Sequence, residues 1–356
     1  MKQIKIKIEF FISLIIALSI MSCNSVTDST TSVEGNWLIP QDEVFDGGPG
    51  RDGIPALESP EMISLSQASY LNDEDLVIGV KSGNEVRAYP HKILDWHEII
   101  NDKVGNKILA VTYCPLTGSA IGWNRVISGQ ETTFGVSGLL YNTNLIPYDR
   151  ATGSNWSQML LESVNGQNIN KEIQLYRVVE TTWATWKEMF PQSKVVSTNT
   201  GFSRNYQNFP YGDYRTNNDN ILFPVKPEDN RLPKKERVLG IVVNGTSKAY
   251  RFSSFTGGIS VVSDNVGGED IVVVGSKNKN FLAAYKSKSS DNKILEFTAV
   301  QNDSVIVMED NEGNKYNVFG EVVSGNRTGQ MLGTTSSFIA YWFAWGAFYH
   351  NSTIYQ

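Results

Sequence analysis

The chain has 356 residues, of which 31 are Lys or Arg and 37 are Asp or Glu, giving a formal net charge of −6 at pH 7. No basic run is present to neutralise phosphates, so the composition excludes a nucleic-acid-binding protein. A chain of this length exceeds one typical hydrophobic core, which predicts two domains.

The first residues predict a bacterial lipoprotein signal peptide. Lysines precede an apolar run, residues 10–21, that is too short to span a bilayer, and a small residue comes just before Cys23. We therefore expect residues 1–22 to be removed and Cys23 to carry a diacylglycerol thioether and fatty acyl chains such as palmitate. Cys114 is then the only thiol of the mature chain, so no intrachain disulfide is expected.

Residues 23–35 follow as the lipidated cysteine and a Ser/Thr-rich tether with too few apolar residues to fold. No later apolar run reaches about 18 residues, so no transmembrane helix is predicted. The membrane is the expected partner, contacted through the lipid in the bacterial cell envelope. Asn24 replaces the aspartate expected of inner-membrane retention, which favours the outer membrane. The sequence identifies no protein partner.

Four segments of the first half resemble four segments of the second half, in the same order and at a nearly constant offset. The pairs are 76–89 with 238–250, 98–112 with 260–274, 149–157 with 309–317, and 181–193 with 340–352. This order predicts a degenerate tandem duplication. The first β-rich repeat, which carries the candidate site, spans 60–198; an ordered connection spans 199–236, and the second repeat spans 237–356.

The sequence of each repeat predicts short strands joined by tight turns. Runs rich in Val, Ile and Tyr alternate with Gly- and Asn-containing turns, as in antiparallel hairpins. Aromatic residues at three- and four-residue spacing in 181–190 and 336–349 predict one amphipathic helix closing each repeat. The expected fold is mainly β, a β-rich α+β class, with two tandem antiparallel β-barrel or sandwich domains, each closed by one helix.

Reactive residues are concentrated in the first repeat. His97 and Glu98 align with apolar and hydroxyl residues of the second repeat, Cys114 aligns with a glycine or serine, and Arg150 has no counterpart. Residues that the fold requires are expected in both repeats, whereas residues kept for chemistry can be lost from one. The pattern therefore predicts a functional site in the first repeat only.

Several of these segments resemble one bacterial family, the domain of unknown function 3179. The similar segments include DWHEIIND (95–102), VTYCPLTGSA (111–120), YDRATGSNWSQ (148–158) and TGFSRNY (200–206). The resemblance implies a secreted or lipid-anchored protein and implies no particular activity. Many relatives carry a second cysteine where this chain has Thr117, so a dithiol pair within this motif is excluded here.

The first hypothesis for Cys114 is a metal site. A thiolate with imidazole ligands suits copper or zinc. His97 is expected opposite Cys114 across the hairpin, and His91 could approach from the preceding segment, so the expected ligands are Cys114, His97 and His91. Met159 would complete a copper site of the electron-transfer type.

The second hypothesis is a thiol nucleophile. Cys114 would need a base, which His97 oriented by Glu98 or Asp95 would supply. Arg150 would hold a substrate carboxylate or stabilise an oxyanion. The catalytic candidates are therefore Cys114, His97, Glu98 and Arg150.

Two alternatives involve no chemistry at Cys114. In one, the chain is a non-catalytic module that binds a peptide or glycan on an aromatic and polar platform. Its candidate binding residues are Tyr113, Asp149, Trp156 and Ser157. In the other, Cys114 is a small buried hydrophobe, and the histidines bond to backbone carbonyls.

Overall fold

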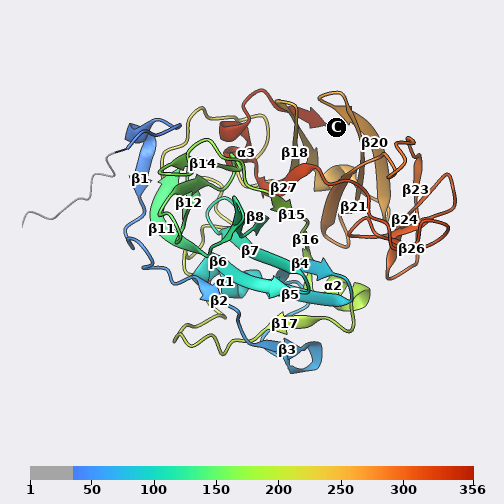
Figure 1. The fold of residues 1–356 in the computed structure, drawn as a ribbon, viewed down its shortest axis with the longest axis horizontal. Coiled ribbons are helices and arrows are strands. Elements are labelled where there is room, and N and C mark those ends of the chain that lie inside the picture. The colour runs from blue at the N-terminus through green and yellow to red at the C-terminus, as the bar shows by residue number, and fades with distance from the viewer. Residues whose placement is uncertain (1–34) are drawn as a thin grey trace, which may run out of the picture. The chain divides into compact units, whose positions relative to one another are not determined.

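Seven sheets and three short α-helices make up residues 35–356, which the computed structural model describes (Figure 1). The predicted mainly β class is confirmed. The predicted signal peptide, Cys23 and all of the tether except Gly35 lie outside the described residues. Within residues 35–356 no helix is both long and apolar enough to cross a membrane.

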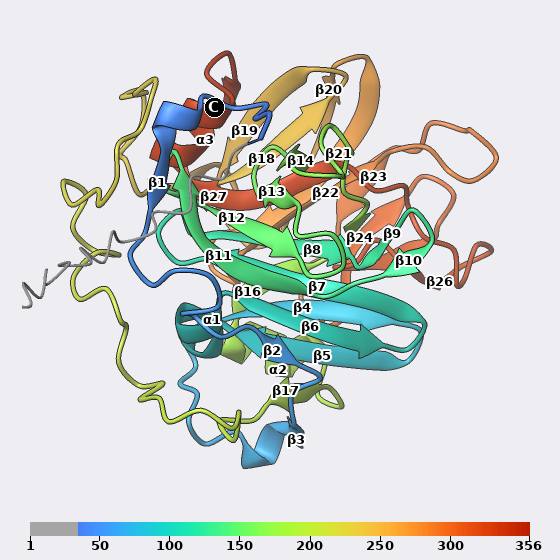
Figure 2. The same cartoon turned by 60° about the vertical axis from the view of Figure 1, so that its left-hand side comes forward.

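Three five-stranded sheets and one two-stranded ribbon belong to the first half (Figure 2). The first sheet has the order β1 (Val44–Asp46), β11 (Phe134–Tyr141), β12 (Asn144–Asp149), β13 (Asn155–Ser157), β14 (Glu162–Asn165). The second has β15 (Leu175–Tyr176), β8 (Ser119–Asn124), β7 (Lys107–Cys114), β6 (Ile99–Val104), β2 (Leu57–Glu58). The third has β16 (Val179–Thr182), β4 (Leu76–Ser82), β5 (Glu85–Pro90), β17 (Lys194–Val196), β3 (Met62–Ser64). The ribbon is β9 (Val126–Ile127) with β10 (Gln130–Glu131), and the helices are α1 (His91–His97) and α2 (Trp183–Met189).

Three smaller sheets belong to the second half. They have the orders β27 (Ser336–Tyr341), β18 (Arg237–Val243), β19 (Thr246–Arg251), β28 (Thr353–Tyr355); then β20 (Ser260–Val266), β21 (Glu269–Ser276), β22 (Phe281–Lys286); and β23 (Phe297–Ala299), β24 (Ile306–Asp310), β25 (Lys315–Asn317), β26 (Val322–Ser324). The helix α3 (Trp342–Phe348) follows β27, and a short 3₁₀ turn (Phe252–Ser254) follows β19.

The two halves contain matching hairpins. The β4–β5 hairpin pairs Gly79 with Ala88, and the β18–β19 hairpin pairs Gly240 with Ala249. Each hairpin is flanked by an antiparallel strand on one side, β16 or β27, and by a parallel strand on the other, β17 or β28. The two predicted helices are present as α2 and α3, directly after β16 and β27, but residues 336–341 of the second predicted segment form β27 and not helix.

Each of these helices places a tryptophan on the glycine of its hairpin. A Cβ atom added at Gly79 would lie 1.9 Å from the Trp186 ring, and one added at Gly240 would lie 2.0 Å from Trp345. The indole N–H of Trp186 donates to a serine hydroxyl at 2.8 Å, and that of Trp345 does so at 2.9 Å. Glycine is therefore required because the helix packs against the strand backbone.

The halves share hydrophobic core. One cluster joins Val77 and Trp186 of the first half to Val272 and Tyr285 of the second. A second cluster contains Cys114 together with residues of β18 and α3. Residues 36–356 accordingly form one compact unit.

The predicted barrel form is wrong for the described residues, since none of the seven sheets closes on itself. Strands of two or three residues, such as β2 and β13, are too short to complete a continuous ladder around a barrel. The connection 199–236 runs along one side of the molecule past α1, and it contains ordered turns (Figure 2).

Candidate functional site

Cys114, the last residue of β7, lies in the core. Its side chain is 1% exposed and belongs to a cluster with residues of both halves. The thiol is 3.7 Å from the Thr143 carbonyl oxygen, to which it can donate. Burial, and then the neighbouring Glu98, raise the pKa of the Cys114 thiol to about 11. A buried, protonated thiol is a poor nucleophile.

His97 is not the expected base for Cys114. Its Nδ1 atom lies 2.7 Å from the Pro55 carbonyl oxygen, and its Nε2 atom lies 2.7 Å from the Tyr206 hydroxyl. Because Pro55 O can only accept, Nδ1 carries the proton, and Nε2 accepts from Tyr206. Burial lowers the pKa of His97 to about 4, so the ring is neutral. Both ring nitrogens thus hold α1 against neighbouring loops.

The residues expected to bind copper or zinc do not form a ligand set. In residues 35–356 no group of three or more His, Cys, Asp and Glu side chains is close enough to hold a metal ion. Cys114, His97 and His91 are therefore not gathered around one point. His97 turns to Tyr206, whereas His91 packs against Tyr113 with ring centroids 4.3 Å apart.

The expected binding platform is buried structure. Trp156 is fully buried and donates its indole N–H to Asp149 at 3.0 Å. The second half has the same arrangement, because the Tyr316 hydroxyl donates to Asp310 at 2.6 Å. Ser157 is 1% exposed and accepts from the backbone N–H of Leu160 at 3.3 Å, as a turn residue does. A feature present in both halves serves the fold.

Arg150 also serves the fold rather than Cys114. Its guanidinium donates to Asp52 at 2.8 Å and to Glu58 at 2.9 Å, and its side chain is 30% exposed. These two carboxylates belong to the segment that precedes the first repeat. Arg150 therefore fastens that segment to the sheet formed by β11 and β12.

The structure brings together a different set of residues, in a cavity beside α1 that we call the α1 cavity. Its volume is about 270 Å³. Of the sequence-predicted residues it contains His91 and Tyr113. Its other charged or hydroxyl-bearing wall residues come from the loop before β4, from α1, from the connection and from the ends of β18 and β27; they are Glu74, Asp75, Lys92, Asp95, Tyr206, Arg215, Arg237 and Tyr341.

Asp95 and Arg215 form an ion pair at this cavity, in which the Asp95 side chain is 3% exposed and the Arg215 side chain 32% exposed. The Nη2 atom of Arg215 donates to Asp95 and, at 3.2 Å, to the Tyr113 hydroxyl. The guanidinium also lies 4.0 Å from the centre of the Phe209 ring. Burial raises the pKa of Asp95 to about 7, against the opposing effect of Arg215. Both hydrogen bonds of this guanidinium use Nη2, so its Nε and Nη1 protons have no partner among the described residues.

Glu180 and Arg237 form the second pair. Arg237 donates to Glu180 Oε1, and His91 Nε2 lies 3.4 Å from the other oxygen, Oε2. Neither His91 Nε2 nor Glu180 Oε2 has a hydrogen-bond partner in residues 35–356, although both residues are over 90% buried. Burial lowers the pKa of His91. Burial favours a raised pKa for Glu180, but Arg237 and His91 together lower it.

The local structures of α1, of β7 and of the β18–β27 pair explain why these side chains meet at the α1 cavity. His91 and Asp95 are four residues apart on α1 and lie on one face of the helix. Successive side chains of β7 point to opposite faces, so Tyr113 faces α1 while Cys114 enters the core. Arg237 and Tyr341 are directly paired between β18 and β27, which brings the second half to the cavity.

Glu180, Arg215, Arg237 and Tyr341 were not predicted from the sequence. The four-residue spacing of His91 and Asp95 was the one local signal for this cavity. The other four residues come from four distant segments, β16, the connection, β18 and β27, and no motif spacing could bring them together.

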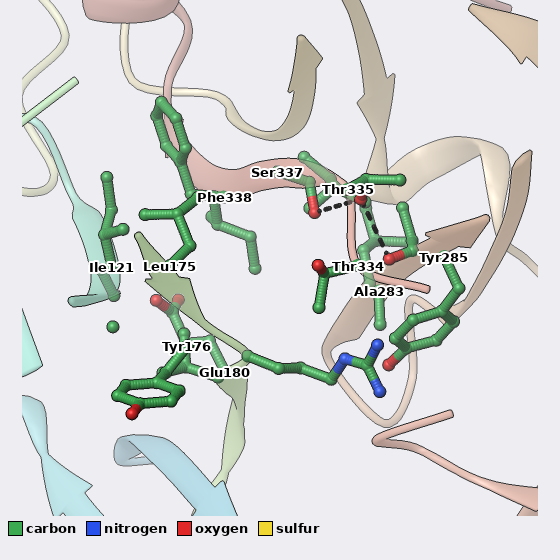
Figure 3. A pocket seen from close by; sticks show the side chains of 18 residues that line it. Ile121, Leu175, Tyr176, Glu180, Ala283, Tyr285, Thr334, Thr335, Ser337 and Phe338 are labelled. Atoms are coloured by element: carbon green, nitrogen blue, oxygen red, sulfur yellow. Dashed lines mark hydrogen bonds between the residues drawn. The ribbon is translucent and has the colours of Figure 1, made fainter. Parts of the chain in front are cut away.

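A second, smaller cavity lies at the seam between the halves (Figure 3). Its volume is about 50 Å³, room for about one or two water molecules. Thr335 donates to the Ala284 carbonyl at 3.1 Å and contacts the Ser337 hydroxyl at 2.9 Å. Glu180 lines this cavity, whereas its neighbour His91 lines the α1 cavity, so the His91–Glu180 contact lies between the two.

Alkylation of Cys114 is expected to be slow in the native protein. Because the thiolate is the reactive form, a pKa of about 11 in place of 9.0 lowers the reactive fraction at pH 7 roughly 100-fold, before burial is counted. Mass spectrometry of the Cys114 peptide after iodoacetamide treatment measures this, with guanidinium-unfolded protein as the control. Rapid native labelling that slows in His97→Ala would contradict it.

No significant match was found among curated proteins or among solved structures. The family model described as "Protein of unknown function (DUF3179)" matches residues 51–352, which is most of the chain and includes every residue of the α1 cavity named above. The resemblance seen in the sequence is thereby confirmed, and the chain belongs to the DUF3179 family.

Proposed function

We propose that the protein is a lipid-anchored protein of the bacterial cell envelope that binds a small anionic molecule in the α1 cavity and exchanges a proton with it through His91. The observation that carries this proposal is the His91–Glu180 contact. His91 Nε2 and Glu180 Oε2 are buried 3.4 Å apart, neither has a hydrogen-bond partner in residues 35–356, and His91 is part of the wall of the α1 cavity. Buried polar groups without partners are costly to the fold and concentrate at functional sites.

The proton on His91 has a favoured position. Glu180 is ionised because of Arg237, so its Oε2 can only accept. A lone pair on His91 Nε2 would repel that oxygen, and the neutral ring therefore carries its proton on Nε2. The lone pair is then on Nδ1, which makes His91 a base held in one tautomer by a carboxylate.

Arg215 is the group that would hold the anion. Its guanidinium is fixed by Asp95, Tyr113 and Phe209, while its Nε and Nη1 protons are free for a ligand. A planar guanidinium binds a carboxylate or phosphate through two parallel hydrogen bonds. Protonation of His91 would balance the charge of an entering anion, so binding and proton uptake support each other.

We also infer that the two halves are copies of one ancestral unit and that the site belongs to the first copy. Support comes from the Gly79–Trp186 and Gly240–Trp345 contacts, which occupy the same place in matching hairpins. Where the first copy has α1, with His91 and Asp95, the second has a single 3₁₀ turn. The acid–base residues of α1 thus have no equivalent in the second copy.

Nuclear magnetic resonance of ¹⁵N-histidine-labelled protein tests the proposed site, because the chain has only three histidines, His91, His97 and His350. Titration with acetate and with inorganic phosphate should shift the His91 ring signals saturably with at least one probe and leave His97 unchanged. The pKa of His91, lowered by burial in the free protein, should rise when the probe is bound.

Two variants test whether Arg215 is the group that binds the anion. Arg215→Lys keeps the charge but loses the paired donors, and should weaken binding by about tenfold or more. Arg204→Gln is the matched control, since Arg204 lies on the same connection, bonds to the Ser203 carbonyl and does not line the cavity. No saturable His91 shift with either probe, or equal shifts in Arg215→Lys, would refute the proposal.

A further inference from the structure

Glu98 is the exception among the buried carboxylates of the described chain. Six aspartate or glutamate side chains are buried in residues 35–356. Five of them have a strong partner: Asp95 with Arg215, Asp102 with Arg87, Asp149 with Trp156, Glu180 with Arg237, and Asp310 with Tyr316. Glu98 is 6% exposed, has no ion pair among the described residues, and accepts one long hydrogen bond of 3.4 Å from the Tyr211 hydroxyl.

Glu98 forms the polar wall of an otherwise apolar cavity. This cavity has a volume of about 160 Å³ and is distinct from the α1 cavity. Its apolar walls include Leu116, Val136, Leu140, Leu145 and Phe223. The space would hold about five water molecules, yet the aliphatic walls offer them few hydrogen bonds, and apolar cavities of this size take up apolar ligands.

The backbone at Glu98 is also unusual. The residue follows the last turn of α1 with φ of 57° and ψ of −32°, in the left-handed region that disfavours side chains with a Cβ atom. Glycine or asparagine commonly occupies such a helix end. Residues in such strained backbone conformations cluster at binding and active sites, and Glu98 is in addition buried without a cation.

We propose that this cavity binds a small aliphatic amine as its ammonium ion, with the amino group on the Glu98 carboxylate and the alkyl chain against the leucine and valine walls. An ammonium ion supplies the positive partner that every other ion-paired buried carboxylate of the described chain takes from an arginine. The cavity volume of about 160 Å³ admits a chain of a few carbons, and each methylene removed from water adds to the affinity.

The test compares three ligands of the same length that differ in charge: n-butylammonium, n-butanol and n-butyrate. Binding to the full chain is measured by saturation-transfer NMR and by isothermal titration calorimetry at pH 9, where the amine is still protonated and the Glu98 carboxyl group, whose pKa burial raises to about 8, is mostly ionised. We expect saturable binding of n-butylammonium, binding of n-butanol weaker by about tenfold or more, and no binding of n-butyrate.

Glu98→Gln is the decisive variant because it keeps the side-chain shape and can still accept from Tyr211. It should fold as the parent does and lose n-butylammonium affinity by about tenfold or more. His91→Gln is the control for the α1 cavity and should leave this binding unchanged. The proposal is overturned if the parent shows no saturable n-butylammonium binding, if n-butanol binds equally well, or if Glu98→Gln retains full affinity.

Discussion

Gly79→Ala is expected to lower the free energy of unfolding by about 3 kcal/mol or more, because the new methyl group would lie 1.9 Å from the buried Trp186 ring. Trp186 cannot move aside, because it is fully buried, its indole N–H donates to Ser193, and the centre of the Phe190 ring lies 4.7 Å from the centre of its own ring. Gly240→Ala should cause a similar loss through Trp345, whose ring would lie 2.0 Å from the new carbon.

Equilibrium unfolding in urea measures both losses. Gly333→Ala is the control, since the atoms nearest to its methyl group would be those of the Lys286 side chain at 3.0 Å or more, and its effect should be much smaller. Because the halves share core residues, each variant should unfold in one transition. A change below about 1 kcal/mol in Gly79→Ala would contradict the close contact, and two separate transitions would contradict the shared core.

Arg237→Met is expected to destabilise the protein by about 3 kcal/mol at neutral pH, because it leaves Glu180 buried without its cation. In the parent protein Arg237 and His91 lower the pKa of Glu180. A carboxyl group with a lowered pKa stabilises the fold above its unfolded pKa, and this contribution is lost as the pH falls through the lowered value. The difference between parent and variant should therefore be largest at neutral pH and shrink in acid.

Two further variants test whether the unpaired charge of Glu180 causes the loss of stability. Arg237→Met combined with Glu180→Gln should recover most of the lost stability, since no unpaired charge remains in the core. Lys187→Met removes an exposed pair with Asp73 and should cost less than about 1 kcal/mol. Thermal unfolding across the pH range gives these comparisons, and a loss in Arg237→Met that is independent of pH would exclude the charge explanation.

The sequence was sufficient to predict those strands and helices that have a periodic residue pattern. The hairpins followed from alternating Val, Ile and Tyr residues with Gly and Asn turns, and the helices at Trp186 and Trp345 followed from their aromatic spacing. These features depend on neighbours within about ten residues, which is the range over which sequence periodicity carries information. How the sheets close or pack depends on contacts between distant strands, and the barrel prediction failed for that reason.

The predicted site and the α1 cavity lie on opposite faces of β7, one residue apart along the strand. The rarity of cysteine drew the prediction to Cys114, but strand alternation directs Cys114 to the core and Tyr113 to the cavity. His97 was chosen because it should lie opposite Cys114 in the hairpin. The position of Tyr206, which occupies its Nε2 atom, depends on the path of the connection and could not be read from spacing.

The pairing of Glu180 with Arg237 has a consequence for the order in which the protein can assemble. The carboxylate belongs to the first half and its cation to the first strand of the second, and Tyr341, which pairs with Arg237, comes near the end of the chain. A chain still emerging from synthesis or export holds Glu180 without its partner. Contacts of such long sequence separation form late, so the α1 cavity is expected to be completed in one of the last steps of folding, after β27 has joined β18.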